Sequence, residues 1–320
     1  MSIFPYDSKK TGGAEVVAKY VDSHMLAGLN NVNRAKWFIV PSYDNPEELS
    51  LWDINIVWVH LPSPWINIEP DRFKSLFVNP YIRQHVSMYV VQSEWHKNDL
   101  VTAFDISPNK IFVMPNPVEL SKCFVGKKNT DRLKLLYTSQ IGRGFHILDR
   151  ALKYIKDDNF DVYVNVSSLD TFVEKDQFSD RYIYRERLPR DEYFDDLSTV
   201  DILPYPCIWG ETFCLTAVEA MASGARVVTT NIGALPDTTG GFARTIDLPY
   251  VDFSKKGEDE IYFEKVAKLF AKALDEEIKD YRLGRFNPTE QINYVNNRFN
   301  DGVTRKYWEE LDKKLALYTV

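Results

Sequence analysis

The sequence predicts an α/β protein with two successive parallel sheets, each covered by helices on both faces. Short runs of β-branched and aromatic residues alternate with stretches of helical periodicity along all 320 residues. A segment at 115–130, rich in Pro, Asn and Lys, interrupts this alternation, which then begins again. Because a chain of this length is expected to hold two domains with separate cores, we expect one sheet on each side of the segment.

Four buried strands are expected in the first half of the chain, before this linker. Their residues are mainly Val, Ile, Trp, Phe and Tyr, and they occupy positions 36–40, 56–60, 88–92 and 111–114. The clearest helix is expected at 14–26, where Val17, Val21 and His24 recur at helical spacing. Strands separated by helical connections are typical of a parallel sheet.

The second half of the chain repeats this pattern. Further strands are expected at 133–138, 161–166, 201–204 and 225–229, with helices near 145–157, 190–198, 213–222 and 258–275. A final helix at 303–317 is amphipathic through Tyr307, Leu311 and Leu315. We therefore assign a first domain to 1–125 and a second to 126–302, and we expect the last segment, 303–320, to pack back on the first domain.

The composition indicates a cytoplasmic protein. No apolar run approaches the roughly 20 residues of a spanning helix, and no basic and apolar leader opens the chain. The three cysteines, Cys123, Cys207 and Cys214, are odd in number and lack the spacing of a zinc site or a disulfide framework. The net charge of −7 argues against a broad nucleic-acid surface, which usually needs a basic stripe. Peripheral attachment to a membrane stays open as an alternative.

The most informative chemistry lies at 209–224, with the sequence WGETFCLTAVEAMASG. Glu219 falls in an apolar, small-residue helix, where a buried carboxylate needs water, a basic partner or a ligand with hydroxyl donors. The alternative is that Glu219 faces solvent. Glu211 comes eight residues earlier, and both carboxylates reach one pocket only if Glu211 lies on the loop that enters the helix. The first amides of that helix, those of Phe213, Cys214 and Leu215, would then be available to a phosphate or sugar oxygen.

These residues resemble the Glu-x7-Glu signature of the family-four retaining glycosyltransferases, with Ala-Met-Ala-x-Gly following Glu219. Arg143-Gly144 is similar to the family's basic residue and glycine ahead of a helix. Other matching segments lie at 11–15, 93–100, 110–118 and 234–238, so the resemblance covers nearly the whole chain. It implies the GT-B fold, in which two Rossmann-like parallel-sheet lobes face each other across a cleft, the first on the acceptor side and the second binding the nucleotide sugar.

The resemblance also implies roles for individual residues. Glu219 would bind the nucleotide ribose, Glu211 the transferred sugar, and Arg143 the diphosphate. His60, at the end of an expected strand, would contact the donor sugar or the acceptor, although a histidine at a strand end is more often structural. The other positions implied in donor binding are Gly12, Gly13, Ser139, Gly144, Phe213, Cys214 and Leu215.

Three features depart from the family pattern. Thr138 and Ser139 stand where the family commonly has Gly-Arg, so a phosphate-directed cation is missing and Ser139 or backbone amides must take its place. Asn116-Pro117 replaces the usual Asn-Gly and stiffens the linker. Few residues precede the glycine loop at 11–13, so the first sheet is expected to be abbreviated at that edge.

The expected reaction is a front-side displacement. The bond between diphosphate and sugar loosens, and the acceptor hydroxyl attacks from the face of the leaving group, so the anomeric configuration is retained. No metal and no other cofactor is expected, because the chain contains no Asp-x-Asp sequence that would clamp a diphosphate through a cation.

Other functions stay open at this point. A nucleotide-sugar epimerase would share the fold, a phosphorylase would need a pyridoxal cofactor, and a non-catalytic protein would bind sugars without turnover. The donor nucleotide is left open among UDP, GDP and ADP. The acceptor is left open among a glycan, a lipid, a small molecule, a protein and a modified nucleobase of viral DNA, because acceptor contacts come mainly from the first domain, where the resemblance is weaker.

Overall fold

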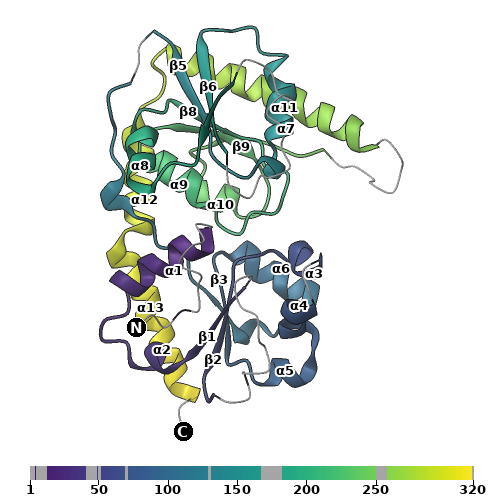
Figure 1. Cartoon of the computed structure of the whole chain (residues 1–320), viewed down its shortest axis with the longest axis vertical. Coiled ribbons are helices and arrows are strands. Elements are labelled where there is room, and N and C mark those ends of the chain that lie inside the picture. Colours follow the sequence, from purple (N-terminus) through teal and green to yellow (C-terminus); the bar gives the residue numbers. More distant parts are fainter. Residues whose placement is uncertain are drawn as a thin grey trace. The chain divides into compact units, whose positions relative to one another are not determined.

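A computed structural model of the chain divides into two compact units (Figure 1). The first comprises Met1–Val118 and Asn297–Val320, and the second comprises Glu119–Asn296. The described residues are 4, 13–40, 49, 52–68, 71–128, 131–166, 182–249 and 258–318. The chain leaves the first unit earlier than position 125 and returns to it before position 303, so helix α12 (Pro288–Phe299) carries the return.

The first unit is built on a four-stranded parallel sheet in the order β1-β2-β3-β4. The strands are β1 (Lys36–Val40), β2 (Asn55–Val59), β3 (Met88–Val91) and β4 (Ile111–Val113). Nearly all of their residues are buried, which explains why the apolar runs predicted these strands to within one residue at each end. All four strand predictions are confirmed.

Helices cover both faces of this sheet. The helices are α1 (Gly13–His24), α2 (Asn30–Arg34), α3 (Ser63–Ile68), α4 (Asp71–Val78), α5 (Pro80–Gln84), α6 (Glu94–Phe104) and α13 (Asp301–Leu315). Figure 1 shows α1, α2 and α13 on one face and α3 to α6 on the other. Ser93 caps α6 by accepting a hydrogen bond from the His96 amide at 3.2 Å, which fixes where that helix begins.

The last helix, α13, completes the core of the first unit. The Trp308 ring lies 5.6 Å from the rings of both Trp37 and Trp58, measured between centroids. Asp312 accepts hydrogen bonds from the amides of Asn31 at 2.7 Å and Val32 at 2.8 Å, which are donors in the first turn of α2. The end of the chain therefore supplies both packing and a helix cap to residues near its start.

The second unit contains a six-stranded parallel sheet in the order β10-β9-β8-β5-β6-β7. Its strands are β5 (Leu133–Tyr137), β6 (Phe160–Val166), β7 (Tyr182–Glu186), β8 (Ile202–Tyr205), β9 (Arg226–Thr230) and β10 (Arg244–Ile246). The four predicted strands are confirmed, whereas β7 and β10 were not predicted. Both lie at edges of the sheet, and their sequences, YIYRE and RTI, lack a continuous apolar run.

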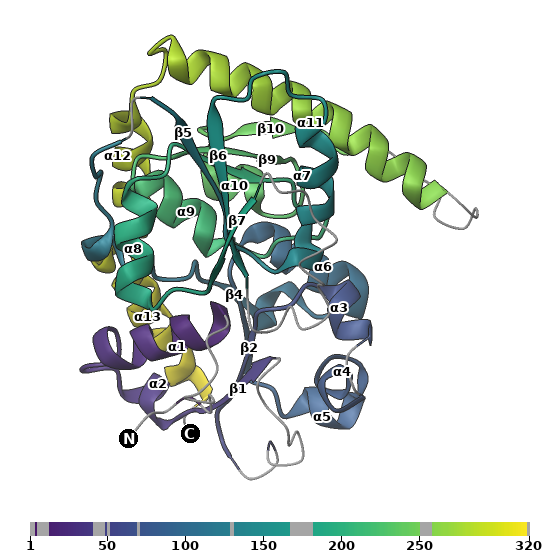
Figure 2. The ribbon, with the colours of Figure 1, turned by 45° about the horizontal axis from the view of Figure 1, so that its top comes forward.

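The helices of the second unit also cover both faces. They are α7 (Phe145–Leu152), α8 (Arg190–Ser198), α9 (Leu215–Ala222), α10 (Leu235–Thr239), α11 (Glu258–Arg282) and α12. In Figures 1 and 2, α8, α9 and α12 lie on one face, and α7 and α11 lie on the other. Helix α8 begins and ends as predicted, and α9 begins two residues later than predicted.

Two helix lengths were predicted wrongly. Helix α7 ends at Leu152 and not near 157, and the Asn159 amide beyond it donates to the Asp157 carboxylate at 2.8 Å. Helix α11 continues past 275 to Arg282, supported by the ion pair between Asp275 and Lys279 at 2.6 Å. It ends next to Gly284, whose φ of 63° suits a helix C-terminus.

Candidate functional site

Glu211 lies on the loop between β8 and α9, beyond the carboxyl end of the sheet in the second unit. The side chain is buried, and its Oε1 atom receives three contacts. Arg143 Nη1 lies 2.5 Å from Oε1, the Tyr205 hydroxyl donates to it, and the Cys207 thiol donates to it at 3.7 Å. Oε2 receives no hydrogen bond from the part of the chain that the structure describes. Glu211 therefore lies on the loop that enters the helix, the position that the sequence analysis set as a condition, and it pairs with Arg143.

Arg143 is held in place by the turn that follows β5. It ends a short 3₁₀ helix, Ile141–Arg143, and its amide donates to the Gln140 carbonyl at 3.0 Å. The next residue, Gly144, has a φ of 126°, and a Cβ there would lie 2.1 Å from the Pro206 carbonyl oxygen. Only glycine permits this approach of the turn to the loop after β8, so Gly144 brings Arg143 to Glu211.

The surroundings of Arg143, Glu211, Tyr205 and Cys207 determine which of these side chains carry a charge. Glu211 raises the pKa of Arg143, which stays a cation. Burial, followed by the charge of Glu211, raises the pKa of Tyr205 and raises the pKa of Cys207 to about 12. The tyrosine and the thiol therefore remain protonated donors at neutral pH. The cluster offers one fixed guanidinium and one carboxylate oxygen to a ligand with both negative charge and hydroxyl groups.

Glu219 lies in the middle of α9 and is 1% exposed, so the prediction that it needs a partner is confirmed. The partner is Arg190, at the start of α8, whose Nη1 and Nη2 atoms contact both carboxylate oxygens. The Tyr193 hydroxyl donates to Oε2 at 3.0 Å. Sequence reasoning missed both residues, because a buried carboxylate indicates that a basic partner exists without indicating which one.

Of the three amides predicted to open α9, those of Phe213 and Cys214 precede the helix, so that part of the prediction is wrong. Cys214 has a φ of 73°, in the left-handed region that a side chain rarely adopts, and helix α9 begins only at Leu215. This conformation turns the chain from the Glu211 loop into the helix at Phe213 and Cys214. Ser139 is half-buried in the turn after β5, on the same loop as Arg143.

The remaining predicted site residues belong to the first unit. His60 follows β2, and its ring lies 4.8 Å from that of Trp58. Burial, with a smaller contribution from His96, lowers the pKa of His60 to about 3, so this side chain is neutral. Gly13 is the exposed first residue of α1, and Gly12 lies outside the described residues.

His96, which the sequence reasoning did not single out, lies beside His60 in the first unit. It is fully buried on α6 and contacts Gln92 Oε1 at 3.1 Å and the Leu61 carbonyl at 3.0 Å. Burial lowers its pKa to about 4. Both histidines are therefore neutral, with His96 buried and His60 half-buried.

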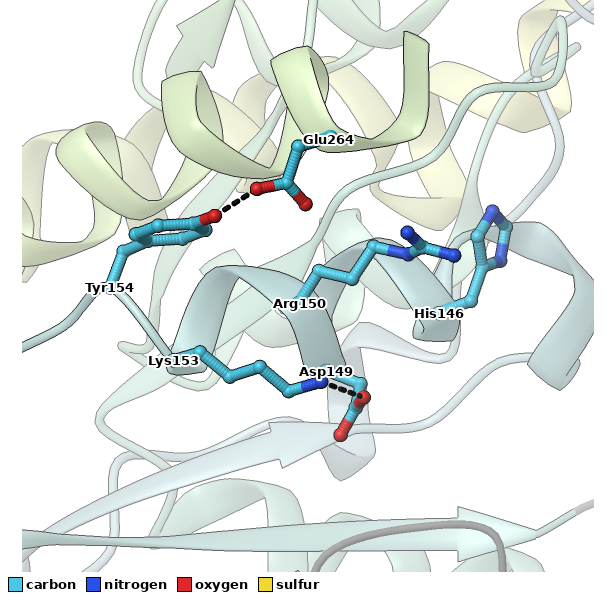
Figure 3. A pocket seen from close by; sticks show the side chains of 6 residues that line it. All are labelled: His146, Asp149, Arg150, Lys153, Tyr154 and Glu264. Carbon is cyan, nitrogen blue, oxygen red and sulfur yellow. Dashed lines mark hydrogen bonds and ion pairs between the residues drawn. The ribbon is translucent and has the colours of Figure 1, made fainter. Parts of the chain in front are cut away.

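A separate hollow lies on the surface of the second unit, between α7 and α11 (Figure 3). It is lined by His146, Asp149, Arg150, Lys153, Tyr154 and Glu264. Lys153 pairs with Asp149 at 3.6 Å, and Tyr154 donates to Glu264. Its charged groups are paired with neighbouring side chains, and it contains none of the predicted site residues.

Two kinds of feature are absent from the described residues. No helix among them is both long enough and apolar enough to cross a membrane. No group of three or more His, Cys, Asp or Glu side chains in the described ranges has the arrangement of a metal site.

Comparison of the sequence with known proteins identifies one viral relative. No family model matches the chain. A protein of Sulfolobus islandicus filamentous virus (isolate Iceland/Hveragerdi), named "Putative glycosyltransferase 45", is 24% identical over 219 residues. The match covers 66% of this chain and 62% of the viral protein, so the chain spans less than two thirds of the length of this relative.

The fold is similar to that of several solved glycosyltransferase structures. Sucrose-phosphate synthase from Thermosynechococcus elongatus has a TM-score of 0.63 at 16% identity, with 83% of this chain and 68% of that chain covered. Anabaena HepE in complex with UDP and glucose also has a TM-score of 0.63, at 13% identity, with 98% and 85% covered. TarM has a TM-score of 0.55 at 13% identity, with 97% and 59% covered. The chain therefore has the α/β GT-B fold, with two Rossmann-like parallel-sheet units.

Proposed function

We propose that this protein is a retaining glycosyltransferase of the family-four type, which transfers a sugar from a nucleoside diphosphate to an acceptor hydroxyl. The observation that carries the proposal is the pair of Arg143 and Glu211 beyond the carboxyl end of the second sheet. Open parallel sheets bind their ligands at that end. The GT-B fold and the glycosyltransferase names of the viral relative and the structural neighbours support the same conclusion.

In this proposal Arg143 stabilises the departing diphosphate. Glu211 keeps the guanidinium charged and oriented, so positive charge is in place before the bond to the sugar breaks. The amides at Phe213, Cys214 and Leu215, with Ser139 and Gly144, contribute further donor contacts. Glu211 Oε2 accepts a hydroxyl of the transferred sugar, and Glu219 binds the ribose. For the first unit we propose that His60 contacts the donor sugar or the acceptor, and that Gly12 and Gly13 contribute to donor binding.

The acceptor proton passes to the departing phosphate oxygen. Tyr205 and Cys207 contact Glu211 but do not act as the base, because the raised pKa of each keeps it protonated. A front-side displacement therefore fits the cluster, with attack from the face on which the diphosphate leaves. Arg143 supplies the cationic charge, so we propose that neither a metal nor another cofactor is needed.

The proposal assigns nucleotide-sugar binding to the second unit and the acceptor side to the first. HepE has been solved with UDP-glucose, so a UDP-sugar is the first donor to test. We propose a hydroxyl of a glycan, a lipid, a small molecule or a modified nucleobase as the acceptor class, and the cytoplasm as the location.

The proposal is tested with the full chain, nucleoside diphosphate sugars and a panel of acceptors. Thermal-shift screening selects the donor, because a bound ligand raises the melting temperature by mass action. Release of nucleoside diphosphate is then measured for the wild type and for Glu211→Gln, and the anomeric configuration of the product is read by NMR. We expect retention, loss of about 10²–10³-fold in kcat for the variant, and full activity in chelator.

Several outcomes would overturn the proposal. An altered free sugar formed without any acceptor would make the protein an epimerase. If Glu211→Gln and the wild type had equal turnover, Glu211 would have no role in the reaction. Inversion at the anomeric carbon, or loss of activity in chelator that Mg²⁺ restores, would reject the displacement mechanism proposed above.

A further inference from the structure

A hollow in the second unit, different from that of Figure 3, lies at the amino end of the six-stranded sheet. We call it the Lys128 hollow. It is lined by Val125, Lys128, Gly224, Tyr281, Phe286 and Pro288. Lys128 comes shortly before β5 and Gly224 shortly before β9, so the strands separate this hollow from Arg143 and Glu211 at their carboxyl ends. Since open parallel sheets bind their substrates at the carboxyl end, a ligand in the Lys128 hollow would occupy a second site.

Lys128 is a half-buried cation that forms no ion pair within the described residues. Its Nζ atom donates to the Val200 carbonyl, which is neutral. Asp201 is the nearby carboxylate, but both of its oxygens already accept hydrogen bonds. Its Oδ1 accepts from the Tyr281 hydroxyl at 2.5 Å, and its Oδ2 accepts from the Lys134 amide at 2.8 Å. Because an ammonium that loses water and gains only a neutral partner is unfavourable, an anion next to Nζ would stabilise it.

The pKa of Lys128 reflects these surroundings. Burial lowers it to about 8, the charge of Asp201 opposes this shift, and the charge of Lys134 adds to it. The side chain is still mostly protonated at pH 7, so the hollow presents a positive charge there. An ammonium has three N–H groups, and the contact with Val200 uses one of them. The others can donate to a ligand.

The remaining walls of the hollow are mainly apolar. The ring centroids of Tyr281 and Phe286 lie 6.2 Å apart, with an angle of 32° between the ring planes. The guanidinium carbon of Arg226 lies 4.5 Å from the centroid of the Phe286 ring, which helps to hold that ring in place. Val125, on another wall, is 50% exposed. Walls of this kind favour the burial of an aromatic ring.

The volume and the charge of the hollow define its ligand. The volume is about 250 Å³, whereas pockets for drug-sized ligands measure about 300–1,000 Å³. The hollow therefore has room for one ring with a short substituent. One lysine balances one negative charge, so a carboxylate fits better than a phosphate monoester, which carries about −1.5 to −2 at neutral pH.

We propose that the Lys128 hollow binds a small aromatic carboxylate. The carboxylate pairs with Lys128 Nζ, and the ring lies against Phe286 and Val125. This inference goes beyond the proposed function and does not depend on it.

The hollow is built from both ends of the second unit. Val125 and Lys128 follow Glu119, at which the chain enters this unit, and Pro288 begins α12, by which the chain returns to the first unit. Because these segments lie together only in the folded unit, a ligand that contacts both binds the folded state alone. It should therefore raise the melting temperature by mass action.

The test uses benzoate as the probe, with the full chain and ligand-observed NMR titration. Acetate has the charge without the ring, and benzyl alcohol has the ring without the charge. We expect the wild type to bind benzoate about tenfold or more tightly than either of them. An excess of UDP should not displace benzoate, because the donor is proposed to bind at the other end of the sheet.

Two lysine variants test the contact with the carboxylate. Lys128→Met should weaken benzoate binding about tenfold or more and change benzyl alcohol binding by less than about twofold. It should fold, because it replaces a poorly paired ammonium with an apolar side chain. Lys127→Met is the matched control, since Lys127 is the exposed neighbour and its removal should leave the Kd of benzoate unchanged.

Several results would overturn the inference. The wild type alone rejects it if benzoate does not bind at about 10 mM, or if acetate binds as tightly as benzoate. Displacement of benzoate by UDP would place the probe in the donor site. Equal affinity of benzoate for the wild type and Lys128→Met, or an equal loss in Lys127→Met, would show that Lys128 does not hold the carboxylate.

Discussion

The two ends of the second sheet hold buried glutamates in different ways. At the amino end, Glu277 receives Arg226 on both oxygens and Arg244 Nε on Oε2 at 2.7 Å, so both of its oxygens are occupied. At the carboxyl end, Arg143, Tyr205 and Cys207 all approach Oε1 of Glu211. The comparison teaches that the end of the sheet at which a carboxylate lies matters more for substrate access than the number of its hydrogen bonds, since open parallel sheets bind their substrates at the carboxyl end.

The largest expected effects on activity and stability come from replacing one arginine at each end of the second sheet by methionine. Arg143→Met should reduce kcat/KM about 10²–10³-fold, because it removes the cation that stabilises the leaving group. It should lower the free energy of unfolding by less than about 2 kcal/mol, since the Arg143 side chain is 38% exposed and Glu211 keeps its hydrogen bonds from Tyr205 and Cys207. Arg226→Met should lower that free energy by about 2–4 kcal/mol, because it leaves Glu277 poorly paired.

Enzyme kinetics and urea unfolding of both variants check this contrast. The kcat/KM of folded Arg226→Met should stay within about threefold of the wild type. If Arg226→Met impaired turnover as strongly as Arg143→Met while both proteins remained folded, the two ends of the sheet would not differ in function.

A second prediction concerns the turn that places Arg143. Gly144→Ala should lower the free energy of unfolding by about 2 kcal/mol, because it puts a Cβ against the Pro206 carbonyl at a φ of 126°. It should also reduce turnover by displacing Arg143 from Glu211. Gly142→Ala is the control, since a Cβ there meets no atom within 4 Å. Equal unfolding midpoints for the two variants would contradict this account of the turn.

A smaller, graded effect concerns the two neutral histidines of the first unit. His60 and His96 have a pKa of about 3 and about 4, below the ordinary value of 6.5, so the unfolded chain takes up protons that the folded chain does not. Stability should therefore decrease as the pH falls from 6.5 towards 4, by about 1 kcal/mol per histidine for each pH unit.

Urea unfolding at several pH values measures this slope. His96→Gln should flatten it, and His24→Asn, at an exposed position on α1, should leave it unchanged. A slope that is the same in all three proteins would show that the buried histidines do not carry the acid sensitivity.

The parts of the fold that the sequence predicted well are those with a local signal. Strands β1 to β4 consist almost entirely of apolar residues, because both faces of a parallel sheet are covered. Strand β7 was missed because its edge position leaves Ile183 42% exposed and breaks that pattern. The unpredicted start of α9 at Leu215 depends on the left-handed backbone of Cys214, which no residue preference announces.

Site residues could be predicted only at positions where the sequence resembles the family motifs. Arg143 and Glu211 are 68 positions apart, and nothing in their local sequence indicates that they meet. Arg190 comes 29 positions before Glu219 and was missed, because the pairing depends on the packing of α8 against α9. Propensity and periodicity describe single elements, whereas a site depends on which elements become neighbours.

The contribution of α13 to the first unit has a consequence for biosynthesis. The second unit is one continuous stretch, so it can fold as soon as the ribosome has released it. The first unit must wait, since Trp37 and Trp58 lack their Trp308 partner, and α2 lacks its Asp312 cap, until the final helix has been translated. The strands of the first unit are thus translated early but complete their packing late.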